Sequence, residues 1–292
     1  MYELVKFGEK TFVIKGDVNV GIYVCDNNDV CLIDTGNSPA FVKCIIKVLK
    51  EKNWNLKYII NTHSHADHMA GNTFLQDTFK CKAYANEKEM LYINYPDMQA
   101  GILYGASPLD ELCNPFVMGQ KCICEDIRKM SILGLEVIEL FGHTSGMIGI
   151  KTSDDVFFCA DAYTSKEILD KYSLQYMYDV DRFLDSLNQI ENISAKYFVP
   201  YHGNIEENIA DTLEENRKTI LENEKLFLKL IEDKISFNNL IYKVFEVNHM
   251  KMNLTQFYVI GSVIKAYLSK LNKDGKIDFV LENDDLFIKK NK

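Results

Sequence analysis

Several common features are missing from this sequence, and each absence excludes a class of protein. No apolar run approaches the roughly 18 residues that a transmembrane helix needs, which argues against a membrane protein. The N-terminus MYELVKFGEKTFVIKG has no basic flank, no apolar core and no small-residue cleavage site, so it does not resemble a secretory signal. Low-complexity tracts and internal repeats are absent as well. We therefore expect a cytoplasmic globular protein without a membrane partner.

The sequence also lacks a net positive charge and the cysteine spacing of a disulfide-bonded framework. The net charge is −9, whereas sequence-independent binding to nucleic acid relies on Lys and Arg that neutralise phosphates, so such binding would need a local basic patch. The eight cysteines are scattered through apolar contexts and are not spaced like those of a small secreted protein. Cys122 and Cys124 form a single C-x-C without a second pair nearby, and we interpret them as buried thiols.

Residues 1–205 alternate short strands with helices, which predicts an α/β domain. The runs TFVIKG, VGIYVCD and DVCLID have the composition of strands, and SPAFVKCIIKVLKEK has apolar residues at helical spacing after a Ser-Pro start. Five later runs, LKYIIN, KCKAYAN, LEVIELFG, DDVFFCAD and KYFVPYHG, are predicted to be strands, with the amphipathic helix DVDRFLDSLNQIEN before the last. The long, aromatic connection over residues 86–128 predicts a lid or binding loop.

Residues 206–292 differ in character and predict a small helical domain. A long charged amphipathic helix is followed by SFNNLIYKVFE and FYVIGSVIKAYLSKLNKDG, which predict two more helices. KIDFVLENDDLFIKK then predicts a hairpin across the polar turn at residues 282–285, and Gly275 suits the C-terminal cap of the preceding helix. The order helix, helix, helix, hairpin is typical of a winged helix.

Three of the six histidines lie within six residues, in the stretch NTHSHADHMAGN. His63, His65 and His68 cannot share one face of a strand or helix, so we expect them on a loop. Asp67 lies among them, and imidazole together with carboxylate suits a divalent ion such as Zn, Fe or Mn. Three more candidate ligands directly follow predicted strands: His143, Asp161 and His202. One sheet edge could therefore bring these three together with the four residues of the histidine loop.

On these residues the sequence resembles the metallo-β-lactamase superfamily. The motifs IDTG, H-x-H-x-D-H, GHTSG, CADAY and YHG occur in this order over the first two thirds of the chain. The resemblance implies a four-layer αββα sandwich, in which two sheets pack face to face between helices, with a two-metal site at the strand ends. The glyoxalase II-like and β-lactamase-like 2 groups are the most similar branches, and the C-terminal region resembles the winged-helix tail of the latter.

The resemblance also implies roles for single residues. The ligands of the first metal would be His63, His65 and His143, and those of the second Asp67, His68 and His202. Asp161 would bridge the two ions. Asp34 would support the histidine loop through hydrogen bonds, with capping of the turn before Gly36 as the alternative. Tyr163 would contact the substrate as a tyrosine does in related lactonases, although its spacing from Asp161 favours packing.

Such a site predicts a binuclear metal-dependent hydrolase. Two divalent ions would bring the pKa of a shared water toward neutrality. Zinc is the expected metal, with iron or manganese as alternatives. The bridging hydroxide would attack an ester-like bond in a thioester, a lactone or a phosphodiester while one metal stabilises the oxyanion. We expect Asp67 and Asp161 to be catalytic because their charge holds the second ion. The expected partner is a small-molecule ester or thioester. The C-terminal region could also form the interface of a homodimer.

Three alternatives remain open from the sequence. A nuclease acting on RNA or DNA would use the C-terminal region for nucleic acid, but Lys265, Lys270, Lys273 and Lys276 equally suit a solvated helix face. A diiron oxidoreductase is disfavoured because His65 stands where that branch has Glu and no flavin module is present. A metal-dependent binding or sensor module would have no need of the complete ligand set.

Overall fold

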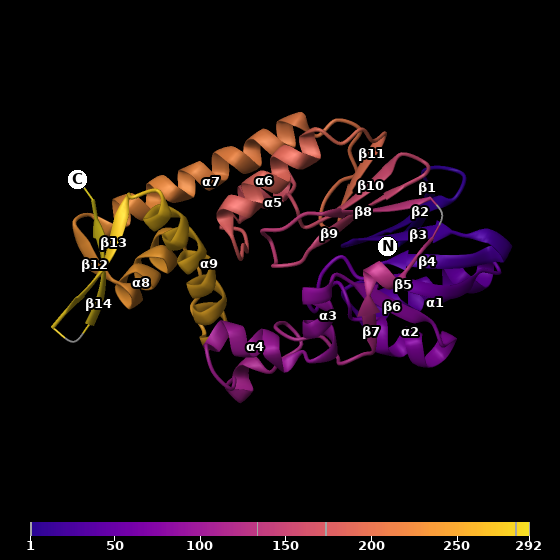
Figure 1. Cartoon of the computed structure of the whole chain (residues 1–292), viewed down its shortest axis with the longest axis horizontal. Helices are drawn as coiled ribbons and strands as arrows, with labels where there is room; N and C mark the ends of the chain where they lie inside the picture. The colour runs from indigo at the N-terminus through magenta and orange to yellow at the C-terminus, as the bar shows by residue number, and fades with distance from the viewer. Residues whose placement is uncertain (1, 133, 173, 284, 292) are drawn as a thin grey trace.

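The computed structural model describes residues 2–132, 134–172, 174–283 and 285–291, and it consists of a two-sheet sandwich followed by a helical region (Figure 1). The two sheets face each other, and helices cover their outer faces. The predicted αββα sandwich with a C-terminal helical region is therefore confirmed.

The first sheet has seven strands in sequence order. Its strands are β1 (Glu3–Lys6), β2 (Thr11–Lys15), β3 (Asn19–Val24), β4 (Asp29–Ile33), β5 (Asn55–Ile60), β6 (Lys82–Ala85) and β7 (Cys124–Asp126). The strands from β1 to β4 pair antiparallel, whereas β4 to β7 pair parallel. Helices on this half are α1 (Pro39–Glu51), α2 (Asn72–Phe79), α3 (Glu87–Asn94) and α4 (Asp97–Tyr104). Helix α1 begins where predicted, because the Ser38 hydroxyl accepts a hydrogen bond from the Phe41 amide.

The second sheet has four strands in the order β11-β10-β9-β8. They are β8 (Leu135–Glu139), β9 (Ile148–Thr152), β10 (Val156–Ala160) and β11 (Tyr197–Pro200), and the helices between the last two are α5 (Lys166–Lys171) and α6 (Val180–Glu191). Strands β10 and β11 are parallel, as a crossover through two helices requires.

Side chains alternate between the two faces of each strand, and this alternation produces two separate hydrophobic cores. Tyr23 and Ile33 from the first sheet pack with Ile150 and Phe158 from the second, which fills the space between the sheets. Their sequence neighbours point outward, where Leu32 packs under α1 and α2. This alternation fixes which face of each strand is inside, and thereby aims the loops at the strand ends.

The C-terminal region contains three helices and a three-stranded sheet of order β12-β14-β13. Its elements are α7 (Ala210–Ile231), β12 (Lys234–Ser236), α8 (Phe237–Val247), α9 (Leu254–Lys273), β13 (Ile277–Glu282) and β14 (Asp285–Lys290). Gly275 has a φ of +69° after α9, as a cap requires, while Asp284 in the predicted turn lies outside the described residues. The order of helices and hairpin is as predicted, and the winged-helix assignment stays a prediction.

Helix α7 joins the two parts of the molecule. Leu213 near its start packs with Phe157 and Leu187 of the sandwich, and Phe227 near its end packs with Tyr267 of α9 in the same continuous cluster (Figure 1). A division of the chain near residue 205 therefore remains a proposal. No helix within the described ranges is both long and apolar enough to cross a membrane.

The connection over residues 86–128 is not a structureless loop. It contains α3, α4 and the edge strand β7, and its role as a lid or binding loop stays a prediction. Tyr95 and Phe116 are exposed, whereas Tyr104 packs against Tyr258 of α9 with ring centroids 5.5 Å apart. The aromatic residues thus have separate roles, and one of them links the sandwich to the C-terminal region.

A substitution at Gly21 of β3 would test the packing between the two sheets. A Cβ at this position would lie 2.5 Å from the Phe158 ring and 3.0 Å from Ile33, so Gly21→Ala should lower the free energy of unfolding by about 1–3 kcal/mol. Gly261→Ala in α9 is the matched control, because its Cβ would meet Ile241 at an ordinary 3.4 Å and the helix should gain about 0.5–1 kcal/mol. Urea unfolding of both variants would measure these changes, and a Gly21→Ala protein as stable as the parent would contradict the packing described.

Candidate functional site

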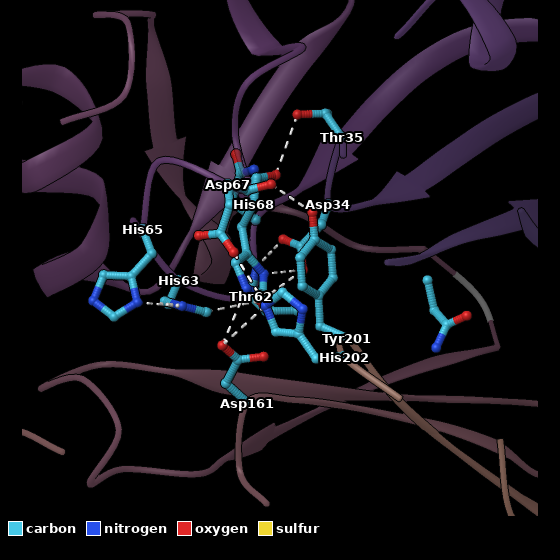
Figure 2. Close-up of polar contacts among 12 residues, drawn as sticks. Asp34, Thr35, Thr62, His63, His65, Asp67, His68, Asp161, Tyr201 and His202 are labelled. Carbon is cyan, nitrogen blue, oxygen red and sulfur yellow. Dashed lines mark hydrogen bonds and ion pairs between the residues drawn. The ribbon is translucent and has the colours of Figure 1, made fainter. Parts of the chain in front are cut away.

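The predicted site residues lie in loops that follow strands at one edge of the sandwich. Strands β4 and β5 are parallel to each other, as are β10 and β11, so the C-terminal ends of each pair meet at the same edge. These ends lead into the loops that carry Asp34, the histidine stretch, Asp161 and His202, and His143 follows β8. Figure 2 shows side chains from these loops pointing toward one another.

A first cluster is formed by three histidine rings. The Nε2 atoms of His63 and His143 each lie 3.0 Å from Nδ1 of His65. Nδ1 of a neutral imidazole has either one proton or one lone pair, so it can satisfy only one of these two neighbours. Three converging nitrogens of this kind suit a cation at their centre.

The protonation of this cluster also suits a metal. Burial lowers the pKa of His63 well below its usual value and lowers that of His143 to about 3. Burial likewise lowers the pKa of His65. All three rings are therefore neutral near pH 7, and neutral imidazole is the form that binds metal ions.

A second cluster lies beside the first and contains carboxylate as well as imidazole. Oδ2 of Asp67 lies 3.1 Å from Nε2 of His202, and the ligand atoms of Asp67, His68 and His202 all lie within 4.8 Å of one another. Burial alone would raise the pKa of Asp67, but the charge of His68 and the hydrogen bond from His202 outweigh it and lower the pKa to about 2. The carboxylate is therefore ionised.

Asp161 lies between the two clusters. Its Oδ2 is 3.4 Å from Nε2 of His143 in the first cluster and 3.4 Å from Nε2 of His68 in the second. Its Oδ1 is buried and has no hydrogen-bond partner among the described residues. A buried carboxylate oxygen without a partner is costly, and a bound cation would satisfy it.

Asp34 holds the second cluster from behind. Its Oδ1 accepts a hydrogen bond from the Thr62 amide at 2.8 Å, and its Oδ2 accepts one from the Thr62 hydroxyl at 2.7 Å. Oδ2 also lies 2.8 Å from Nδ1 of His68, so that Nδ1 donates to the carboxylate while Nε2 faces Asp161 (Figure 2). Asp34 thus holds the histidine loop through hydrogen bonds, and its role in supporting a metal ligand stays a prediction.

The Tyr201 ring fixes the other face of His68. The two rings are stacked with centroids 3.5 Å apart, and the Tyr201 hydroxyl donates a hydrogen bond to the carbonyl of Asp67. Sequence analysis did not single out Tyr201, although its place between β11 and His202 is a signal that the side chain lies at the site.

Glu89 of α3 is a second residue that the sequence analysis missed. It is fully buried, and its carboxylate accepts hydrogen bonds from the amide and hydroxyl of Ser64 at 3.0 and 2.6 Å. It also accepts bonds from the Thr144 hydroxyl at 2.7 Å and the Gly146 amide at 2.8 Å. Glu89 thus ties the loop of His63 and His65 to the loop of His143. Glu89 lies four residues before the buried Ile93 on the same helix, and this spacing was the signal in the sequence that its side chain faces inward.

Three other residues considered from the sequence lie away from the clusters. Tyr163 is only 2% exposed and packs with Phe157 and Phe183 behind the second sheet, which favours packing over substrate contact. Cys122 and Cys124 are buried thiols as expected, and burial raises the pKa of Cys122 to about 11.

Comparison with known proteins agrees with this geometry. The model of a family described as the metallo-beta-lactamase superfamily matches residues 13–202. A hydroxyacylglutathione hydrolase from Prochlorococcus marinus is 26% identical over 281 residues, which covers 92% of this chain and 96% of the relative. A beta-lactamase-like protein 2 homolog from Drosophila melanogaster is 21% identical and covers 88% of this chain and 82% of its own.

A solved structure shares the fold across the whole chain. The crystal structure of a beta-lactamase domain protein from Burkholderia ambifaria has a TM-score of 0.71 at 12% identity, and the match covers 99% of this chain and 94% of that one. The family match spans the loops that carry both histidine clusters, from Asp34 to His202. The chain belongs to the metallo-β-lactamase superfamily.

Proposed function

We propose that this hydrolase uses two divalent metal ions, zinc in the first place, to cleave a small ester-like substrate such as a thioester or lactone. The observation that carries the proposal is the position of Asp161, whose Oδ2 contacts both clusters at 3.4 Å. His63, His65 and His143 would hold the first ion, Asp67, His68 and His202 would hold the second, and Asp161 would contribute to both sites.

The donor set fits two such ions. Five imidazoles and two carboxylates supply the nitrogen and oxygen ligands that borderline divalent metals prefer. The unpartnered Oδ1 of Asp161 and the facing nitrogens of His63, His65 and His143 are the atoms that a cation would satisfy. When bound, two such ions would lower the pKa of a shared water and polarise the substrate oxygen.

The protein's own contribution is orientation. Asp34 keeps the His68 proton on Nδ1, so that Nε2 faces the site, and Tyr201 prevents the ring from tilting. Glu89 keeps the first cluster assembled by holding its two loops together. Two buried carboxylates therefore support the clusters, Asp34 behind the second and Glu89 beside the first.

A small-molecule substrate is supported over nucleic acid. The hydroxyacylglutathione hydrolase relative matches nearly the whole chain, including the C-terminal region. Lys270 lies within 4 Å of Asp181, Glu224 and Asp274, and Lys273 and Lys276 are also ion-paired. Lysines held by carboxylates in this way offer little free charge to a phosphate backbone.

The first prediction concerns activity and Asp161. Metal-loaded protein should hydrolyse a thioester or a lactone faster than a model phosphodiester, and Asp161→Ala should reduce kcat/KM by more than roughly a hundredfold, since even outer partners of metal ligands can cost that much. Initial rates on the three substrates, with metal content measured for each preparation, would test this.

Asp185→Ala is the control for this experiment, because Asp185 is exposed on α6. It should behave like the parent. Turnover of the phosphodiester alone would overturn the substrate class and point to a nuclease, whereas Asp161→Ala with parental turnover would overturn the role of the bridging carboxylate.

Glu89 gives a second prediction, on metal affinity. Glu89→Ala would leave four buried donors without an acceptor, so it should lower the free energy of unfolding by about 3 kcal/mol or more and weaken metal binding by roughly tenfold to a hundredfold. Glu89→Gln keeps one acceptor oxygen and should fall between. Unfolding in urea and competition with a metal indicator would give both quantities.

Glu87→Ala is the matched control on the same helix. Its exposed ion pair with Arg128 should contribute only about 0–1 kcal/mol. Unchanged metal affinity in Glu89→Ala would show that Glu89 stabilises the fold without positioning the histidines.

A further inference from the structure

A narrow hollow of about 30 Å³ adjoins His65. Its walls are Tyr92 of α3, Ile102 and Leu103 of α4, and Tyr176 and Tyr178 of the segment before α6. Neither Lys nor Arg lines it among the described residues. The carboxylate of Glu89 reaches its wall, but both oxygens are occupied by the bonds from Ser64, Thr144 and Gly146. This inner hollow therefore suits an uncharged, largely apolar group.

A second hollow, of about 390 Å³, adjoins the first. The two share Tyr92, Thr144, Ser145 and Tyr178 as lining residues. The outer part contains both Lys88 and Arg182. Unlike the inner hollow, it presents positive charge to whatever occupies it.

Lys88 and Arg182 belong to different elements but face the same ring. The Lys88 ammonium lies 5.2 Å and the Arg182 guanidinium 5.5 Å from the centroid of Phe141. Both cations therefore lie beside one aromatic ring and line the same hollow. An anion bound there would be attracted to both side chains.

Neither cation has an acidic partner in the described part of the chain. Lys88 Nζ donates only to the carbonyl of Ser145 at 3.3 Å, and no ion pair of either side chain is found there. Asp179 also lines the outer hollow, but its Oδ1 caps α6 by accepting a bond from the Arg182 amide at 3.2 Å. By contrast, the lysines at the end of α9 are paired with carboxylates.

We propose that the two hollows are one substrate cleft, which takes a compound with an apolar group beside the metal clusters and an anionic group, carboxylate or phosphate, at its far end. Lys88 and Arg182 bind the anionic group, and the tyrosines and α4 enclose the apolar group. This inference rests on the proposed function, because it names the substrate class of the same site.

The C-terminal region supports one wall of this cleft by packing against α4. Leu103 packs with Tyr258 and Val259 of α9, and Tyr104 stacks edge to face on Tyr258. Figure 1 shows α4 reaching from the sandwich to the start of α9. The wall that carries Ile102 and Leu103 is thus held in place by the C-terminal helices.

The kinetic test uses acetyl thioesters of alkyl thiols that end in a carboxylate, a phosphate or a neutral carboxamide, so that the alkyl chain lies in the inner hollow and its end group in the outer one. The parent should favour the anionic substrates over the carboxamide by roughly tenfold to a hundredfold in kcat/KM, the range expected for hydrogen bonds to charged groups. The order of carboxylate and phosphate identifies the natural anion. The double variant Lys88→Met with Arg182→Gln should lose the preference and keep the parental rate on the carboxamide.

Lys121→Met is the matched control, because the Lys121 ammonium also lies over an aromatic ring, 5.3 Å from the centroid of Tyr95, but outside this cleft. It should keep the full preference. A parent without preference, or a double variant that retains it, would overturn the anionic subsite.

A binding measurement separates this inference from the proposed function. Metal-loaded protein should bind phenylalkyl sulfonates more tightly than the corresponding phenylalkyl alcohols, and the difference should vanish in the double variant and shrink with salt. Such binding without hydrolysis of any thioester would retain the subsite and reject the thioester activity. Hydrolysis of all three thioesters at one rate, with no difference in binding, would retain the thioester activity and reject the anionic subsite.

Discussion

The arrangement of the site depends on one carboxylate, that of Asp161, which is held out of bulk water between two groups of histidines. A buried ionised carboxylate is stable only when positive charge surrounds it. Burial would raise the pKa of Asp161, but the charges of His68 and His202 outweigh it and hold the pKa well below the usual range. The backbone is shaped for this position, since the pairing of β10 with β11 shifts register after Phe158 and Ala160 has a φ of +53°. That left-handed conformation costs roughly 1–2 kcal/mol for a residue with a Cβ, and it turns the chain so that Asp161 leaves the strand toward the histidines.

The clusters are assembled from loops distant in sequence, and two further carboxylates hold those loops together. Asp34 connects the end of β4 to the histidine loop, and Glu89 connects that loop to the one that carries His143. Each accepts bonds from backbone amides as well as from hydroxyls, so the position of the main chain is fixed along with the side chains. Removing either partner would leave buried donors unsatisfied, which makes the geometry of the site and the stability of the fold parts of the same network.

The sandwich and the seven proposed ligands could be predicted from the sequence because both follow local rules. Strand alternation identifies the sheets, and His143, Asp161 and His202 were found because each follows a strand. Glu89 escaped prediction because a glutamate on a helix is normally exposed, and its burial depends on Ser64 and on Thr144, 55 residues later. Strand β7 was missed since its three residues, Cys-Glu-Asp, have little strand propensity and are ordered by pairing with β6. Tyr163 shows the same limit, because the turn after β10 decides whether the side chain meets substrate or core.

The position of α4 explains why the C-terminal helices belong with the site. An eight-residue helix on a connection between two sheet strands buries too little surface to hold a fixed position alone. Here Ala100 and Leu103 pack in a small separate core that is completed by Tyr258 and Val259 of α9. Helix α9 is in turn fixed to the sandwich through α7, whose apolar residues join the core behind the second sheet. The wall of the cleft is therefore supported through α9 and α7. A change in the packing of the C-terminal helices would move Ile102 and Leu103, and with them the shape of the hollow beside His65, without touching any proposed metal ligand.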